Sequence, residues 1–523
     1  MSKLTMFILA LIVLGVIGAV VFYFMASRAE KEGFESASDA SRFKGTIHVA
    51  GDDYIGYWPL TSLEFKRLLL QEGYAIEWTN DGGQYAQRHK KFAEGEYDIM
   101  VLPINSYLFH GRNANYPGVI IAAISDSKGA DNVLAYKNML SSNPTVNDLN
   151  QSGLKICVTP NSPSSFLLNI AIVHFDLTAL KSTRVWEVAT NGSQDAYEKF
   201  RRKDCGAAVL WELDVSRALE SQEVASVYGS DKVAGMIIDV FVIQRSLVES
   251  EKMVAFFKAY FGTLQYYSEN RVEMIEQIQK NPAFNSKDKA EQALRRIAWF
   301  DLKTNCNDWF SIPQSGIAQQ QRREKIIEAI AQITDIMLEI GDIELDPLLG
   351  NPYKITIRTT DASALTRVCT MTENKSIADI GAKLPVARTF DALSDEEWSR
   401  LSVVGKMKIV PILFQSGTTK LTREAQDTIT HELLAALELN YPQYRVLIRG
   451  HTAPSSDENA NQLLSQARAD SVREHLILSG LDQNRIKAAG VGSREPLPRP
   501  VGEGDLSYSS RLPRVEFILL EDK

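Results

Sequence analysis

Short apolar segments alternate with amphipathic segments from residue 44 to about residue 350, and this pattern constrains the fold more than any other feature. It begins with GTIHVAG at 45–51 and reads strand, helix, strand, helix, strand as far as YDIMVLP at 97–103. It starts again with LKICVTP at 154–160, and long helical stretches with apolar stripes follow after residue 248. Strands that alternate with helices are typical of parallel α/β sheets, so we predict a two-lobed α/β domain with a cleft between its lobes.

A second folded unit is predicted for residues 403–523, after a less regular connector at 351–402. Its expected strands are KMKIVPILF, YRVLIRGHT, RIKAAGVG and RVEFILL, and its expected helices cover 417–440 and the segment after GHT. This mixture predicts a separate α+β domain.

The N-terminal segment 4–27 contains no charged residue. A helix needs about 20 apolar residues to cross a bilayer, whereas the apolar region of a secretory signal has only about 7–15. We therefore expect an uncleaved transmembrane anchor at 1–27, followed by a polar stalk at 28–43. Gly15, Gly18 and Ala19 are compatible with a homo-oligomer formed through this helix.

The composition argues against several classes of function. The formal net charge of the 523-residue chain is -8, which disfavours binding to nucleic acid. No HExxH, GxSxG or phosphate-loop motif is present, so we expect no catalytic site, no cofactor and no metal site. The cysteines at 157, 205, 306 and 369 form no CxxC pair. Cys157 and Cys205 could form a disulfide, and buried free thiols are an equal alternative.

Several phrases of the first unit, in order, resemble the solute-binding proteins of ABC importers of the nitrate, sulfonate and thiamine-precursor type. The resemblance implies a type II periplasmic-binding fold over about 44–350, with a small-molecule ligand between the lobes. The phrases are GDDYIGYWPL, FAEGEYDIMV, SDSKGADNVLAY, LKICVTPNSPSSFLL and CGAAVLWELDV.

Ligands of open α/β sheets lie beyond the carboxyl ends of the strands, and polar side chains follow several predicted strands here. The serines near 162 open a helix, where they favour an anion or simply cap the helix. Asp52, Asp53 and Glu212 suit a cationic ligand instead, so the ligand class stays open. The candidate ligand-binding residues are Asp53, Tyr54, Trp58, Gly83, Gln84, Asn161, Ser162, Ser164, Ser165, Trp211, Glu212 and Asp239.

The C-terminal unit resembles the OmpA-like peptidoglycan-binding domain through ILFQSGTTKLT, VLIRGHT, N-x-x-LS-x-x-RA and RIKAAGVGSREP. The resemblance implies that Arg468 binds the carboxylate of diaminopimelate. In the family an aspartate after GHT binds the amine, but Ala453 stands here, and Leu512 and Pro513 also depart from the closing motif. Either Asp457 replaces the missing acid, or the site binds the wall weakly, or it binds something else. The candidate peptidoglycan-binding residues are Thr452, Asp457, Asn461, Leu464, Ser465, Arg468 and Arg514.

These features together predict a non-catalytic, single-pass inner-membrane protein with the bulk of its chain in the periplasm. We expect it to bind a ligand, to tether to peptidoglycan, and to contact an inner-membrane partner protein. One alternative is the substrate-binding component of an ABC importer. Another is a stator-like or scaffold subunit of an envelope complex, although the apolar segment lacks the acid that proton carriage requires.

Overall fold

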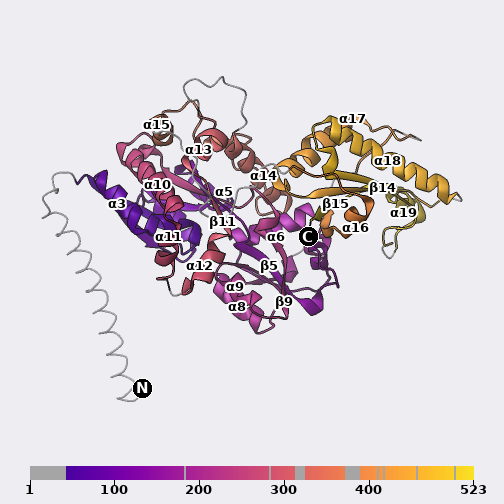
Figure 1. The fold of residues 1–523 in the computed structure, drawn as a ribbon, viewed down its shortest axis with the longest axis horizontal. Coiled ribbons are helices and arrows are strands. Elements are labelled where there is room, and N and C mark those ends of the chain that lie inside the picture. The colour runs from indigo at the N-terminus through magenta and orange to yellow at the C-terminus, as the bar shows by residue number, and fades with distance from the viewer. Residues whose placement is uncertain are drawn as a thin grey trace, which may run out of the picture.

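The computed structural model describes residues 43–181, 184–281, 284–312, 324–371, 389–408, 411–415, 418–454, 457–499 and 502–522. The expected anchor at 1–27 and nearly all of the expected stalk at 28–43 lie outside these residues. Within the described ranges, no helix is long and apolar enough to cross a membrane. Two α/β lobes and a C-terminal unit make up the described chain (Figure 1).

The first lobe contains a six-stranded mixed sheet with the strand order β11-β4-β10-β3-β1-β2. Strands β1, β2 and β3 are parallel, whereas β10 is antiparallel to β3 and β4, and β11 is antiparallel to β4. Strands β3 and β4 are buried along their whole length, as expected for strands covered on both faces. The elements of this lobe are β1 (Gly45–Gly51), η2 (Ile55–Tyr57), α2 (Trp58–Thr61), α3 (Leu63–Gln71), β2 (Tyr74–Asn80), α4 (Tyr85–Ala93), β3 (Ile99–Pro103), α5 (Ile104–Gly111), η3 (Arg112–Ala114), β4 (Gly118–Ser127), β10 (Ile238–Gln244), η8 (Arg245–Leu247), α10 (Glu251–Glu269), α11 (Arg271–Ile278), α12 (Lys287–Leu294), β11 (Ile297–Trp299), α13 (Leu302–Thr304), η10 (Asn305–Trp309), α14 (Lys325–Glu339), η11 (Pro352–Lys354) and α15 (Ala364–Met371).

The second lobe contains a five-stranded sheet with the order β7-β6-β8-β5-β9. Strands β6, β7 and β8 are parallel, and β5 is antiparallel to β8 and β9. Four strands of each lobe therefore share the expected direction, and they are β1, β2, β3 and β4 in the first lobe and β6, β7, β8 and β9 in the second. The prediction is wrong for β10 and β11 in the first lobe and for β5 in the second. Strands β5 and β10 are the ones that directly follow the two short interlobe connections. The elements are β5 (Asp131–Tyr136), η4 (Lys137–Met139), η5 (Val146–Leu149), β6 (Ile156–Val158), α6 (Pro163–His174), α7 (Thr178–Lys181), η6 (Arg184–Trp186), β7 (Glu187–Ala189), α8 (Ser193–Arg201), β8 (Ala207–Trp211), α9 (Asp214–Leu219), β9 (Val224–Gly229) and η7 (Ser230–Lys232).

Two short segments, 128–130 and 230–237, connect the lobes between β4 and β5 and between β9 and β10. The hydroxyl of Ser230 lies 2.7 Å from the hydroxyl of Ser127 and accepts a hydrogen bond from the backbone N–H of Gly129 at 2.7 Å. These bonds fasten the two crossovers to each other, so the lobes cannot separate there without breaking them.

Two disulfides link segments that are distant in sequence. Cys157 pairs with Cys205, which is the pairing that the sequence left open, and Cys306 pairs with Cys369. The second bond joins η10 to α15, which belongs to the expected connector. The hydroxyl of Thr356 also donates a hydrogen bond to the carbonyl of Ile120 in β4. The described residues 351–371 therefore pack against the first lobe.

The C-terminal unit has a four-stranded sheet with the order β12-β15-β13-β14, and α18 packs on β13 and β14. The strand expected at 406–414 is instead Ser402–Met407, and Pro411, which has no N–H for a ladder, follows it. The elements are α16 (Asp395–Arg400), β12 (Ser402–Met407), α17 (Arg423–Thr428), the π-helical turns η12 (Ile429–Leu433) and η13 (Ala436–Asn440), β13 (Arg445–His451), α18 (Glu458–Leu478), η14 (Gln483–Arg485), β14 (Ile486–Gly492), α19 (Asp505–Arg511) and β15 (Arg514–Glu521).

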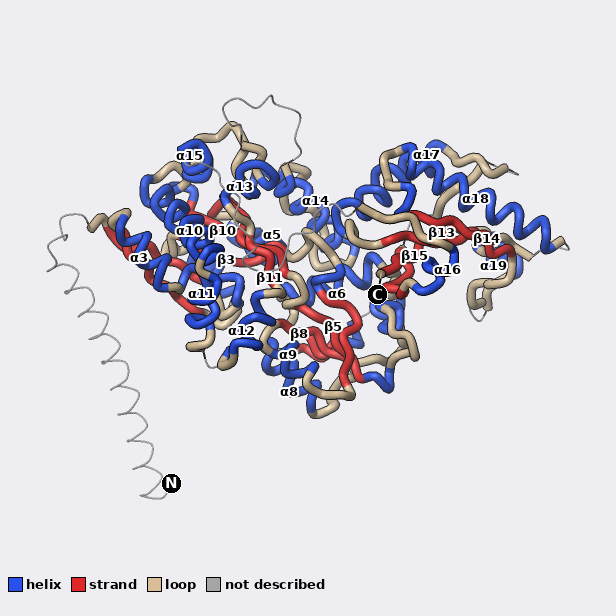
Figure 2. Tube along the Cα trace, in the orientation of Figure 1, coloured by secondary structure: helices blue, strands red, loops and turns tan. Residues whose placement is uncertain are grey.

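The C-terminal unit packs against the second lobe near α6, and it also reaches α14 (Figure 2). The backbone N–H of Lys408 donates to the carbonyl of His174 at 2.6 Å, and the hydroxyl of Tyr441 lies 2.6 Å from Nδ1 of His174. Lys232 forms an ion pair of 2.6 Å with Glu521. Backbone hydrogen bonds, a buried tyrosine and an ion pair thus fix the unit to the lobe.

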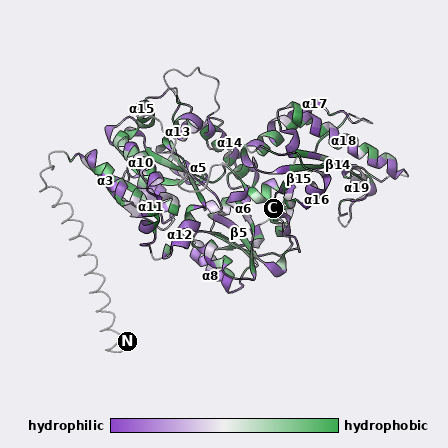
Figure 3. Ribbon diagram, in the orientation of Figure 1, coloured by the Kyte–Doolittle hydropathy of each residue, from purple (hydrophilic) through white to green (hydrophobic). Residues whose placement is uncertain are grey.

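Hydrophobic and hydrophilic residues alternate along the helices (Figure 3). One core cluster extends through both lobes and the C-terminal unit, and a second cluster, which includes Leu134, Phe200 and Leu210, lies in the second lobe. The two-lobed α/β domain and the separate α+β domain confirm the fold class predicted from the sequence. The transmembrane helix stays a prediction.

Candidate functional site

A cavity of about 550 Å³ lies between the two lobes, where the loops after β1, β2 and β8 meet. This is the edge at which open α/β sheets bind their ligands. Half of the predicted ligand-binding residues line this cavity, and their ligand role stays a prediction. Those that line the cavity are Asp53, Tyr54, Gly83, Trp211, Glu212 and Asp239.

The other predicted ligand-binding residues lie outside the cavity lining. Trp58 packs on Tyr267, with 5.0 Å between ring centroids. Ser162 caps α6 by accepting a hydrogen bond from the backbone N–H of Ser165 at 3.1 Å. Their ligand role stays a prediction, as it does for Gln84, Asn161 and Ser164.

Two buried ion-pair clusters shape the cavity wall, and the sequence reasoning missed the cation in each. Arg88 is buried, and its guanidinium bonds Asp81 at 2.5 Å and Asp52 at 2.8 Å. Arg296 pairs with Glu212. Spacing along the chain gives no signal for these pairs, because their partners lie on different elements.

Asp131 and Asp239 are two buried carboxylates of the cavity wall, each only 3% exposed. Asp131 accepts hydrogen bonds from the hydroxyls of Ser164 at 2.5 Å and Ser127 at 2.8 Å. Asp239 accepts one from the hydroxyl of Tyr57. Burial raises the pKa of both carboxyls, that of Asp131 to about 6. Asp131 was not among the predicted residues, since it opens a strand instead of following one.

Asp131→Asn should become more stable relative to the wild type as the pH rises from about 4 to about 6. An aspartate in an unfolded chain has a pKa of about 3.9. A carboxyl group with a raised pKa stabilises the fold while it is protonated, and this contribution is lost as the pH rises through the folded-state value. Neighbouring Asp52 and Glu212 add to the effect. Melting temperatures measured against pH check this, and a constant difference between the two proteins would contradict it.

In the C-terminal unit, close packing of α18 on the sheet explains the glycines of the GHT and GxG motifs. A Cβ on Gly450 would lie 2.1 Å from the carbonyl oxygen of Ser465, and one on Gly490 would lie 2.5 Å from the backbone nitrogen of Gln466. The hydroxyl of Ser465 accepts a hydrogen bond from the backbone N–H of Gly492 at 2.9 Å. Ser465 is therefore part of the helix–sheet contact.

Arg468 is a partly buried cation of this unit. Its guanidinium lies over the ring of Phe414, 5.1 Å from the centroid, and it forms no ion pair among the described residues. Its Nε and the Oγ1 of Thr452 are both buried without a hydrogen-bond partner in the described part of the chain. Burial lowers the pKa of Arg468. An anionic group that accepts hydrogen bonds would satisfy this arginine.

The remaining predicted residues of this unit are engaged within the fold. Asp457 caps α18, because its carboxylate accepts a hydrogen bond from the N–H of Ala460 at 3.0 Å. Arg514 forms an ion pair of 2.7 Å with Glu516. Asn461 is buried and Leu464 is half-buried. Replacement of the missing acid by Asp457 would therefore cost the helix its cap.

Residues 413–503 match the OmpA family, so the chain contains an OmpA domain at its C-terminus. The probable lipoprotein YiaD of Escherichia coli (strain K12) is 34% identical over 86 residues, which are 16% of this chain and 38% of that protein. The peptidoglycan-associated lipoprotein of Rhizobium meliloti (strain 1021) is 28% identical over 86 residues, which are 16% of this chain and 48% of that protein. The chain thus spans less than half the length of these relatives.

Solved structures of periplasmic solute-binding proteins resemble the first unit. The alkanesulfonate-binding protein SsuA from Xanthomonas axonopodis pv. citri has a TM-score of 0.46 and 14% identity, over 60% of this chain and 99% of that chain. The CA3427 gene product of Candida albicans has a TM-score of 0.47 and 13% identity, over 60% of this chain and 96% of that chain. The strand order and the two crossovers define the two-lobed architecture independently of these likenesses.

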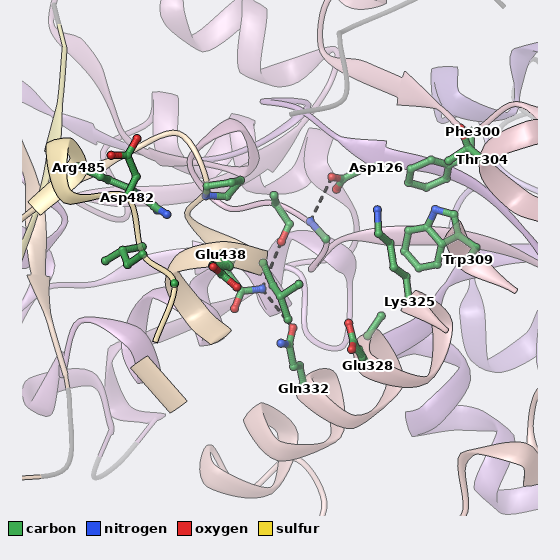
Figure 4. A pocket seen from close by; sticks show the side chains of 18 of the residues that line it. Asp126, Phe300, Thr304, Trp309, Lys325, Glu328, Gln332, Glu438, Asp482 and Arg485 are labelled. Atoms are coloured by element: carbon green, nitrogen blue, oxygen red, sulfur yellow. Dashed lines mark hydrogen bonds between the residues drawn. The ribbon is translucent and has the colours of Figure 1, made fainter. Parts of the chain in front are cut away.

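A second cavity, of about 400 Å³, lies where the OmpA domain meets the lobes (Figure 4). Its walls include Asp126 from β4, Lys325 and Glu328 from α14, and Arg485 from the OmpA domain. Oδ1 of Asp126 is buried without a partner in the described ranges, while Oδ2 accepts a hydrogen bond from the N–H of Gly235. The interlobe crossover, α14 and the OmpA domain therefore all contribute residues to the wall of this cavity.

Proposed function

We propose that this protein binds a small molecule between its lobes and holds the cell wall through its OmpA domain, from the periplasmic side of the inner membrane. The observation that carries the tether is Arg468, a partly buried guanidinium without an ion pair among the described residues, inside an OmpA domain. The interlobe cavity carries the ligand-binding part. The uncharged segment 4–27 supports the membrane anchor.

Relatives of the OmpA domain support the same compartment. Those named above include a peptidoglycan-associated lipoprotein, and an outer membrane protein A of Serratia odorifera is 30% identical over 91 residues, which are 17% of this chain and 37% of that protein. Their names place them in the bacterial envelope and, in one case, at peptidoglycan. Two disulfides also suit an oxidising compartment such as the periplasm.

Sedimentation of the full-length protein with diaminopimelate-type peptidoglycan tests the tether. Saturable pelleting that free meso-diaminopimelate reduces would support it. Pelleting that this competitor leaves unchanged would argue against recognition of the peptide stem.

The contacts between the domains support coupling of the two sites. Asn440 of the OmpA domain exchanges hydrogen bonds with Ala234, because its carbonyl accepts from the N–H at 2.8 Å and its amide donates to the carbonyl at 3.3 Å. Gln443 donates to the carbonyl of Asp231 at 2.9 Å. Crossover 230–237 leads directly into Asp239 of the cavity wall. Closure of the cavity would therefore shift the segment that the OmpA domain holds.

Asn440→Ala should accelerate amide hydrogen exchange in residues 230–237 by about tenfold. The amide of Asn440 also bonds Gln332 of α14 at 3.1 Å, so the substitution releases two partners. A buried carbonyl without a partner costs about 1–3 kcal/mol, and 1.4 kcal/mol corresponds to a factor of ten. Hydrogen-exchange mass spectrometry checks this. Glu432→Ala, an exposed change in the same helical stretch, is the control, and equal exchange in both variants would contradict the coupling.

A further inference from the structure

The interlobe cavity is strongly acidic. Six carboxylates and one guanidinium, that of Arg217, contribute to its lining. Three of the carboxylates are neutralised by arginines, in the pairs Asp52–Arg88, Glu212–Arg296 and Asp214–Arg217. The other three carboxylates are those of Asp53, Asp131 and Asp239. They form no ion pair among the described residues.

The place where an anion would bind is already filled by the protein's own carboxylate. The N-terminus of α6 is the positive end of the helix dipole, which favours a negative charge. Asp131 supplies that charge, because its Oδ1 accepts a hydrogen bond from the hydroxyl of Ser164 in the first turn of α6. A ligand carboxylate, sulfonate or phosphate at this point would meet the carboxylate of Asp131.

The remaining walls suit a positive charge with an apolar body. The aromatic rings of the lining are those of Tyr54, Tyr57, Tyr85, Trp211 and Phe284. Aromatic faces attract ammonium groups, most strongly where water is excluded. The hydroxyl of Tyr54 is buried and has no hydrogen-bond partner in the described part of the chain, so an N–H donor in the cavity could bond it.

We propose that the interlobe cavity binds an organic cation, an amine or a quaternary ammonium compound, between the unpaired carboxylates and the aromatic rings. This inference rests on the proposed function, because it takes the cavity to be a ligand site. A cation would neutralise carboxylates of the lining that form no ion pair among the described residues, whereas an anion would add to the negative charge of the lining.

Calorimetric titration of the full-length protein tests the inference, with putrescine, spermidine and choline as cations and ethanesulfonate, nitrate and phosphate as anions. At least one cation should bind, and none of the anions. Asp53→Asn removes an exposed carboxylate of the lining, and it should weaken cation binding by about tenfold or more. Asp131→Asn should weaken cation binding as well. Glu198→Gln, an exposed change on α8 outside the cavity, should leave binding unchanged.

Each other outcome is decisive. Binding of an anion without any cation would overturn the inference and leave the proposed ligand-binding function standing. If neither a cation nor an anion bound, both the inference and the proposed ligand-binding function would be contradicted. Cation binding that Asp53→Asn and Asp131→Asn leave at the wild-type level would place the cation elsewhere and overturn the inference.

Discussion

Replacing Arg468 with alanine should weaken the binding of the full-length protein to diaminopimelate-type peptidoglycan by about ten- to hundredfold. The guanidinium is held over Phe414, and its buried Nε has no partner among the described residues. A ligand carboxylate would receive charge-assisted hydrogen bonds from it. Such bonds contribute about 1.5–3 kcal/mol, and each 1.4 kcal/mol is a factor of ten in affinity. Quantitative sedimentation against increasing amounts of cell wall measures the change.

Two further variants sharpen this test. Arg423→Ala removes an exposed arginine from the same domain and should bind as the wild type does. Ala453→Asp restores the acid that the family uses for the amine of diaminopimelate, so it should strengthen binding. If the Arg468→Ala variant sedimented with cell wall to the same extent as the Arg423→Ala variant, the proposal that this site binds the wall would be wrong. A gain in Ala453→Asp without wild-type binding would mean that the site has lost this ligand.

Local patterns predicted the elements of the fold and the order of the two domains, because apolar periodicity depends on near neighbours. They did not predict the strand directions next to the crossovers, where β4 leads into β5 and β9 leads into β10. They also misplaced β12, since the apolar run continues through Pro411 beyond the end of the strand at Met407. Pairing direction depends on contacts between distant segments, which periodicity does not contain.

The candidate site was predicted unevenly for a related reason. The rule that ligands lie at strand ends led to Asp53, which follows β1, and to Trp211 and Glu212 at the end of β8. It could not lead to Asp131, which is the first residue of β5 and directly follows the interlobe connection 128–130. The helix-start serines pointed to an anion, yet Ser164 already bonds a carboxylate of the protein. A helix N-terminus indicates an anion, and only the folded chain shows whether that anion belongs to the ligand or to the protein.

Replacing Arg88 with methionine should lower the free energy of unfolding by about 3–5 kcal/mol. Its side chain is wholly buried and donates to Asp81, to Asp52 and to the carbonyl of Val101 at 2.5 Å. Methionine fills a similar volume but leaves two nearly buried carboxylates without a cation. Urea denaturation of the full-length protein measures the loss. Arg201→Ala breaks an ion pair of 2.8 Å on the exposed face of α8 and should leave the unfolding midpoint unchanged.

The cause of that loss can be separated from packing. If unpaired carboxylates are responsible, Arg88→Met combined with Asp52→Asn and Asp81→Asn should recover much of the stability, because no buried charge remains. If lost hydrogen bonds and packing of the arginine are responsible, the triple variant should be no more stable than Arg88→Met alone. Recovery would mean that Arg88 is present to neutralise the first-lobe wall of the cavity. It would also mean that Asp52 is excluded from ligand binding while Asp53, the next residue along the chain, remains available.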